Sequence, residues 1–278
     1  MMFAVIFIVL LIERFFDWGH LRYWDWFPEY QRLVQKKLPK VRHDIIFALT
    51  VLSLLIALLC IEFLIGNVLY GFIQLLFQII VLLYCLGPRN FWVDAFNAMS
   101  TVDEKQKSTL LESAKKNHHL TDYNANELAA RSFFIEANCR VFAVLFWYMV
   151  LGPVGALLYR LISYRARNVT DQTDRQDLHQ AEIAISILDW LPIRALIIVF
   201  ALGGHFVQVF SYWHKHLSMN LSENEILLAG AGFAALGIDT EHAKVHPKEY
   251  LVENSAIYLV DRALVIVLII AGIISTVL

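Results

Sequence analysis

The stretch that decides the fold is 45–86, IIFALTVLSLLIALLCIEFLIGNVLYGFIQLLFQIIVLLYCL, in which Glu62 is the only acidic or basic side chain. A helix needs about 20 apolar residues to cross a hydrocarbon layer of ~30 Å. The stretch is too long for one crossing and suits two, with Gly66 and Asn67 at the hairpin. It therefore predicts a pair of membrane helices.

Working outward, the composition and four further apolar runs extend this prediction to the whole chain. Hydrophobic residues make up 58% and charged residues 17%, with a mean hydropathy of +0.56, which is outside the range of soluble domains. We expect an all-α, polytopic membrane bundle of five or six membrane segments with additional amphipathic cytoplasmic helices, forming one integral domain over 1–278 in contact with the lipid bilayer. The remaining apolar runs are 1–12, 141–159, 195–210 and 263–278.

The N-terminal run is predicted to be a short, uncleaved span over 2–16, because it lacks a basic region before it and a small-residue cleavage site after it.

Net charge is −2, so no overall basic field argues for nucleic acid.

Basic residues predict the orientation. They are concentrated in 17–43 and 88–140, and short basic loops are retained on the cytoplasmic side. We therefore expect both segments inside, with 88–138 as a cytoplasmic helical segment, and the N-terminus outside.

Simple alternation conflicts with the arginines after residue 159. Two arrangements remain open for 141–159. The segment bends at Gly152-Pro153 and returns to the cytoplasmic side, because proline in a helix interior removes a hydrogen bond, or it spans fully and the charge rule fails here. We favour the re-entrant arrangement.

Candidate binding residues are the polar side chains at membrane depth or at the ends of spans, because such residues face a bundle interior or an aqueous cavity. Arg194 and His205 are predicted to share a helix face. We expect the whole set to converge on one basic cavity open to the cytoplasm; the alternative is a series of independent boundary residues that reach toward headgroups. Capping competes as a role for Asp189, and core packing for His205. The candidates are Glu13, Arg14, Asn138, Arg140, Arg160, Arg165, Asp189, Arg194 and His205.

No metal site is predicted. His242 and His246 have a helical spacing suited to zinc, but Pro247 follows and no third ligand is placed. The three cysteines, Cys60, Cys85 and Cys139, lack metal spacing and are interpreted as packing residues. No cofactor can be named.

Two long blocks carry a family resemblance. Residues 136–148 (EANCRVFAVLFWY) with 151–160 (LGPVGALLYR), and residues 187–196 (ILDWLPIRAL), resemble the AmpE family. The resemblance covers nearly the whole chain. It implies a multi-pass protein of the bacterial inner membrane associated with β-lactamase regulation, which we expect to bind an anionic small molecule and a membrane or cytoplasmic signalling partner.

The AmpE family is in turn similar to CobD/CbiB, membrane enzymes of cobalamin biosynthesis that form an amide bond. Those enzymes carry a polar Asn-Thr-x-Asp-Ser signature where this chain reads SYRAR at 163–167. The departure favours a regulator without catalytic residues and an anionic ligand, since guanidinium groups pair with phosphate and carboxylate. A membrane-bound amide-forming enzyme, similar to cobinamide-phosphate synthase, is the alternative; a transporter is less attractive because inverted repeats are not evident.

Overall fold

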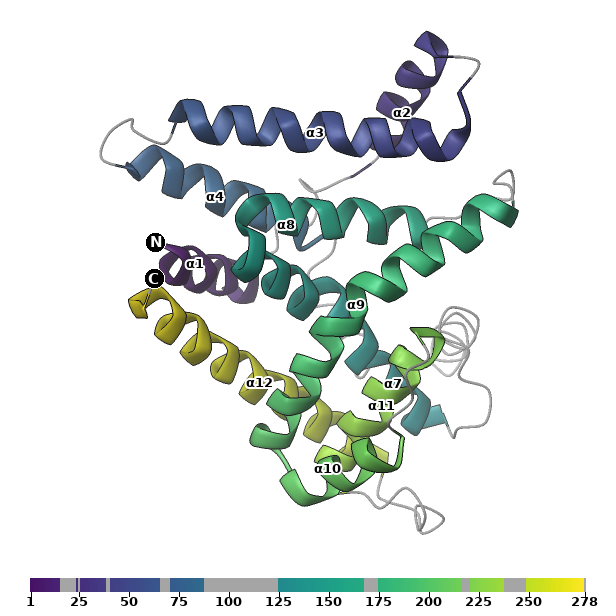
Figure 1. Cartoon of the computed structure of the whole chain (residues 1–278). Helices are drawn as coiled ribbons and strands as arrows, with labels where there is room; N and C mark the ends of the chain where they lie inside the picture. The colour runs from purple at the N-terminus through teal and green to yellow at the C-terminus, as the bar shows by residue number, and fades with distance from the viewer. Residues whose placement is uncertain are drawn as a thin grey trace. The chain divides into compact units, whose positions relative to one another are not determined.

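A computed structural model gives the fold of the chain (Figure 1). It falls into two compact units, residues 1–90 with 144–185 and residues 91–143 with 186–278, and each is described by itself. The structure describes residues 1–15, 24, 26–38, 41–65, 71–87, 125–167, 175–216, 221–237 and 249–277. Every secondary-structure element within these ranges is helical, as the sequence predicts.

The first unit is built on two helix pairs. Helix α1 (Met2–Phe15) packs against α4 (Phe72–Cys85), and α2 (Trp26–Lys37) packs against α3 (His43–Ile65). Most of α8 (Ala143–Arg167) and the start of α9 (Arg175–Gly203) belong to the same unit. A hydrophobic cluster joins α2, α3 and α8 through Phe27, Val51 and Leu161.

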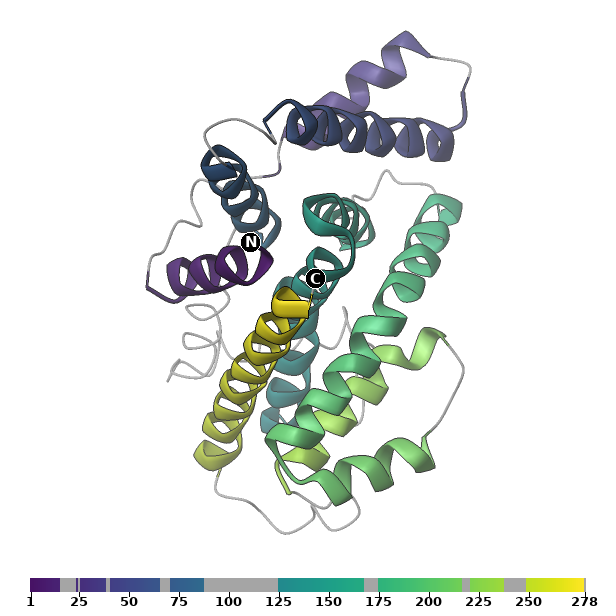
Figure 2. The ribbon, with the colours of Figure 1, turned by 60° about the vertical axis from the view of Figure 1, so that its left-hand side comes forward.

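The second unit is a group of helices around α7 (Ala125–Ala137), which packs against both α11 (Asn224–Ala235) and α12 (Glu249–Val277) (Figure 2). Helix α10 (Phe206–Lys215) packs against α11 in turn, and a short 3₁₀ turn η4 (Leu221–Glu223) precedes α11. Nearly every residue of α11 is buried, which its small side chains permit because they let neighbouring helices approach closely.

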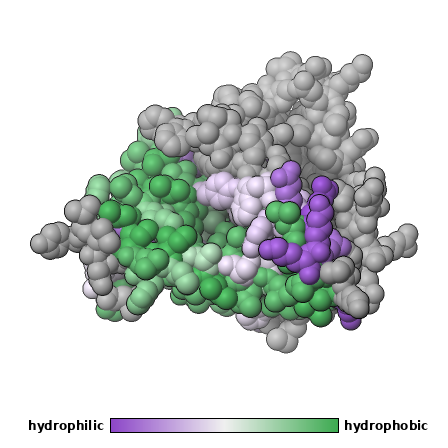
Figure 3. Space-filling model, turned by 90° about the horizontal axis from the view of Figure 1, so that it is seen from above, coloured by the Kyte–Doolittle hydropathy of each residue, from purple (hydrophilic) through white to green (hydrophobic). Residues whose placement is uncertain are grey.

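Four helices in the described part of the chain are long and apolar enough to cross a membrane: 45–65, 130–167, 180–203 and 255–277. Helix α4 is apolar but shorter, about 21 Å at 1.5 Å per residue. Many large side chains of α3 are exposed, such as Leu52, Leu59 and Phe63, which is typical of a lipid-facing surface. Seen from above, apolar side chains cover the left of the described surface, and hydrophilic side chains gather on the right, the side on which α2 lies in Figure 1 (Figure 3).

The predicted interruption of α8 is confirmed. Gly152 has φ 65° and ψ −153°, so two helical stretches meet there across a break, and Pro153 follows inside the helix. The left-handed φ is one that glycine adopts without a Cβ penalty. By contrast, α9 continues through Pro192, although proline removes one backbone hydrogen bond there.

A five-residue π-helix, η3 (Asn138–Phe142), separates α7 from α8. A π-turn holds one more residue per turn than an α-helix and often occurs at functional sites. The sequence did not predict it, since its residues keep an ordinary helical pattern.

Candidate ligand site

A buried polar pair joins the start of the π-helix to α9 in the second unit. The Asn138 side-chain amide donates a hydrogen bond to Oδ1 of Asp189 at 3.4 Å, and both residues are almost fully buried, with 1% and 4% of their surface exposed. The Oδ1 atom of Asn138 has no hydrogen-bond partner. Because a buried acceptor without a donor costs about 1–3 kcal/mol, this carbonyl is prepared to accept a bond from a ligand or from water.

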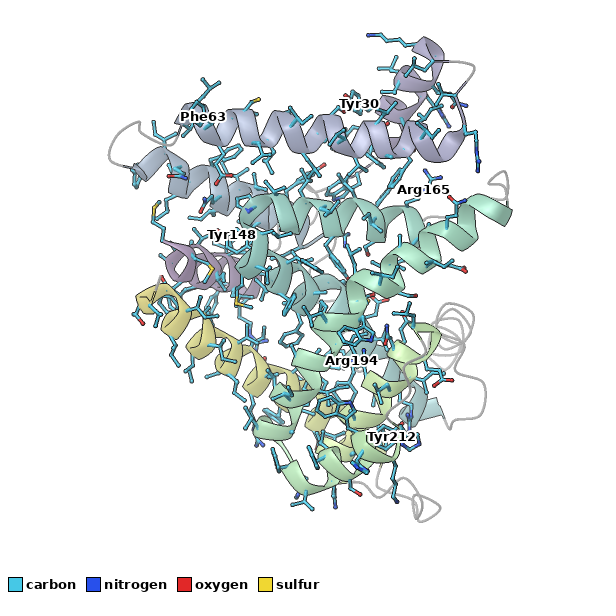
Figure 4. All side chains as sticks on the ribbon, in the orientation of Figure 1. Tyr30, Phe63, Tyr148, Arg165, Arg194 and Tyr212 are labelled. Carbon is cyan, nitrogen blue, oxygen red and sulfur yellow. The ribbon has the colours of Figure 1, made fainter. Side chains whose placement is uncertain are left out.

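Arg194 lies one turn beyond Asp189 on the same helix and reaches α11. Its Nη1 donates to the carbonyl of Trp190 at 2.9 Å and to Oδ1 of Asn224 at 3.0 Å, and its guanidinium stacks over the Trp190 ring at 4.2 Å (Figure 4). The amide of Asn224 in turn donates to the carbonyl of Ser186 at 3.0 Å. This arrangement fixes Arg194 against its own helix and against the N-terminal end of α11.

Other arginines of the second unit also have partners. Arg140, in the π-helix, is paired with Glu136 at 2.7 Å in the i,i+4 spacing that the sequence indicates. Arg131 is buried, and its guanidinium lies 5.1 Å from the centre of the Phe233 ring.

The prediction that Arg194 and His205 share a helix face is wrong. Helix α9 ends at Gly203, and His205 has extended backbone with φ −83° and ψ 90°. Its side chain is exposed, rather than packed in a core, and its backbone N–H bonds to the carbonyl of Ala235 at 3.0 Å. Two successive glycines before it let the chain turn, because a Cβ at Gly204 would overlap that same carbonyl.

The other four predicted residues belong to the first unit. Glu13 is buried and Arg14 is exposed, as expected for neighbours that project about 100° apart on a helix. The Arg160 guanidinium lies 6.0 Å from the Trp24 ring centre, and that of Arg165 lies 4.3 Å above Phe47. Convergence of all nine predicted residues on one cavity stays a prediction.

A hydrogen-bonded chain that the site prediction missed links three helices of the first unit. The Tyr148 hydroxyl donates to Oε1 of Gln78 at 3.1 Å, and Nε2 of Gln78 donates to Oε1 of Glu62 at 2.9 Å. The sequence signal was the isolated carboxylate in the apolar stretch 45–86. Asn224 was missed because its surroundings are polar in sequence and were not assigned to a buried helix.

Within the described residues no group of three or more histidine, cysteine or acidic side chains is placed to hold a metal ion. His242 and His246 lie outside these residues. No disulfide joins the three cysteines; Cys85 and Cys139 are buried, as expected for packing residues, whereas Cys60 is exposed.

Comparison with known proteins places these features in a family. The cobalamin biosynthesis protein CobD of Chromobacterium violaceum is 34% identical over 101 residues, covering 35% of this chain and 32% of that protein. CobD of Stutzerimonas stutzeri is 24% identical over 194 residues, covering 64% of this chain and 63% of that protein. Each match thus spans less than two thirds of the relative's length, and no solved structure matches. The family model described as "Regulatory signalling modulator protein AmpE" matches residues 1–277, and the chain therefore belongs to the AmpE family.

Proposed function

We propose that this protein modulates inducible β-lactamase from the bacterial inner membrane, in response to a signal linked to cell-wall turnover. Membership of the AmpE family over 1–277 and four helices suited to crossing a membrane support this role. The family description as a signalling modulator, together with the arginines in 163–167, supports a regulator in preference to an enzyme.

The observation that carries the proposal is the Asn138–Asp189 pair. A polar pair inside apolar helices gains little stability, since both groups lose their hydration and the bond that joins them is long, at 3.4 Å. Asn138 is the first residue of the π-helical turn. The backbone hydrogen bonds of such a turn change when the helix shifts its register. We infer that ligand binding alters this contact and moves α7 relative to α9 for a signalling partner to detect.

The ligand we propose is anionic. The Arg194 guanidinium lies over the Trp190 ring and donates to two neutral oxygens, contacts that leave its positive charge in place. Guanidinium groups bind carboxylates and phosphates through charge-assisted hydrogen bonds.

The proposed topology has residues 17–43 and 88–140 in the cytoplasm and the N-terminus outside, with five or six membrane segments. The break at Gly152 supports a re-entrant start of α8. A single cysteine at exposed Lys36, in a variant without Cys60, Cys85 and Cys139, should react with a membrane-impermeant maleimide only in inverted vesicles. Reaction in intact spheroplasts would contradict this orientation.

Genetic complementation tests the regulatory role. In a strain with an inducible β-lactamase, deletion of the gene should change the induction curve, and Asp189→Asn should fail to restore it while accumulating normally in the membrane. Thr50→Val is a matched control, because the Thr50 hydroxyl is buried but bonds only within its own helix, to the Ile46 carbonyl at 2.7 Å. Induction that is unchanged by the deletion would refute the proposal.

The second candidate is a membrane-bound amide-forming enzyme, and the similarity to CobD favours it. In that role Asp189, held by Asn138, would be the group that contacts the reacting carboxyl or amine. Purified protein incubated with ATP, candidate carboxylates and an aminoalcohol should then release ADP or AMP and form amide. Absence of both turnover and specific ligand retention would exclude this candidate.

A further inference from the structure

An aromatic cluster in the first unit surrounds Trp24, which is only 2% exposed. Its ring centre lies 4.8 Å from that of Tyr84, 5.9 Å from that of Tyr164 and 6.0 Å from that of Trp26. Two segments far apart in the sequence, α4 and α8, therefore pack on this indole together with its near neighbour Trp26.

The two tryptophans of the cluster differ in their hydrogen bonds. The indole N–H of Trp26 donates to the Tyr84 hydroxyl. The indole Nε1 of Trp24 is buried and has no hydrogen-bond partner. Indole nitrogen is a donor only, so the group that would complete this site must be an acceptor.

A positively charged guanidinium lies over the face of the Trp24 ring. The guanidinium carbon of Arg160 is 6.0 Å from the Trp24 ring centre. Gly87, with φ 107°, lets the backbone approach the same guanidinium, since a Cβ there would lie 2.5 Å from its Nη2 atom. Arg165 stands one turn further along α8, against Phe47. An acceptor at Trp24 is therefore favoured electrostatically when it is an anion.

Two apolar helices end close to residues of the cluster. Helix α4 ends at Cys85, directly after Tyr84, and α8 ends at Arg167. Tryptophan and tyrosine are enriched at the level of lipid headgroups, where phosphate groups are abundant.

We propose that the indole N–H of Trp24 and the guanidinium of Arg160 together bind a phosphate group. The inference rests on the proposed function for its expectation of anionic ligands, and it gives one such ligand a chemical class and a binding place in the first unit. The phosphate belongs either to a phospholipid headgroup at the membrane surface or to a soluble phosphate ester.

Binding to the purified full-length chain tests the site. Retention of phosphatidylglycerol is measured by native mass spectrometry, with diacylglycerol as the lipid without phosphate, and inorganic phosphate is titrated by calorimetry as the soluble arm. Trp24→Phe keeps the ring and removes the donor, and should weaken phosphate binding about tenfold, as expected for a hydrogen bond to a charged group. Trp26→Phe is the matched control, because its N–H is already bonded to Tyr84, and it should bind as the unaltered chain does.

Preferential retention of phosphatidylglycerol identifies the lipid source, and binding of inorganic phosphate alone identifies the soluble one. Equal retention of diacylglycerol together with no binding of inorganic phosphate, or full phosphate binding by Trp24→Phe, overturns the inference. Arg160→Lys supplies a second test if Trp24→Phe fails to fold. Lysine keeps the positive charge but lacks the paired N–H donors of the guanidinium. Unchanged phosphate binding by Arg160→Lys also overturns the inference.

The induction assay separates this inference from the proposed function. If Trp24→Phe loses phosphate binding while β-lactamase induction stays normal, the assignment of the phosphate site stands and its link to regulation is refuted. A wild-type chain that binds no phosphate, in a strain where gene deletion still alters induction, refutes the site and leaves the regulatory role standing.

Discussion

The hydroxyl group of Tyr212 in α10 occupies the space where a Cβ atom on Gly230 of α11 would lie. This contact accounts for the close packing of α10 on α11, and it makes Gly230 a position where even one methyl group cannot be added without displacing the ring.

Gly230→Ala should therefore destabilise the second unit by about 1–3 kcal/mol, the usual cost of overpacking. The measurement is unfolding in mixed micelles of sodium dodecyl sulfate and a mild detergent. Tyr212→Ala in the same chain should recover part of the loss, since it removes the clashing ring. A double variant less stable than both single variants would contradict this explanation.

Gly152→Ala isolates backbone strain from packing. No heavy atom lies within 4 Å of the added Cβ, but φ is 65°, so an alanine should cost about 1 kcal/mol or more. Gly203→Ala serves as the control, because its nearest neighbour would be Ile266 at 3.5 Å, an ordinary contact. The measurement is the unfolding free energy of each variant, and Gly152→Ala should lose more than Gly203→Ala. Equal losses would mean that the break in α8 does not depend on glycine.

The Asn138–Asp189 contact predicts unequal effects of two substitutions. Asn138→Ala removes the donor to Asp189 and should lower the unfolding free energy by about 1–3 kcal/mol. Asp189→Asn keeps an acceptor oxygen for the Asn138 amide and should cost less. The same micelle assay compares them, and a larger loss for Asp189→Asn would show that the carboxylate has a stronger structural role than this bond.

The chain Tyr148–Gln78–Glu62 predicts a graded series. Tyr148→Phe removes one hydrogen bond, whereas Gln78→Leu removes both. Since interhelical hydrogen bonds in membranes are worth about 0.6 kcal/mol on average, Gln78→Leu should cost roughly twice as much as Tyr148→Phe. Combining the two substitutions should add nothing to Gln78→Leu, and a fully additive double variant would refute the chain.

Much of the fold is predictable from the sequence because membrane helices follow from hydropathy. The pair of apolar helices in 45–86 and the break at Gly152 are examples, since length and a Gly-Pro step are local properties. The end of α9 at Gly203 was missed. Its cause is tertiary, namely the bond from His205 to the Ala235 carbonyl on a different helix.

The candidate site could be predicted only in part. Asn138 and Asp189 do meet, and Glu136 does pair with Arg140, since the latter spacing is local. The buried place of Asn224 and the unsatisfied indole of Trp24 depend on which distant helices meet, and no period in one sequence encodes that.

The π-helical turn at 138–142 amounts to one inserted residue in the reading frame of a long helix. If the same residues wound as regular α-helix, Phe134 would turn by about 100° about the helix axis relative to Ala143, the residue after the turn. Phe134 packs on Phe200, with ring centres 5.3 Å apart, and it fills the space beside Gly232. The extra residue in the turn therefore keeps Phe134 facing these partners.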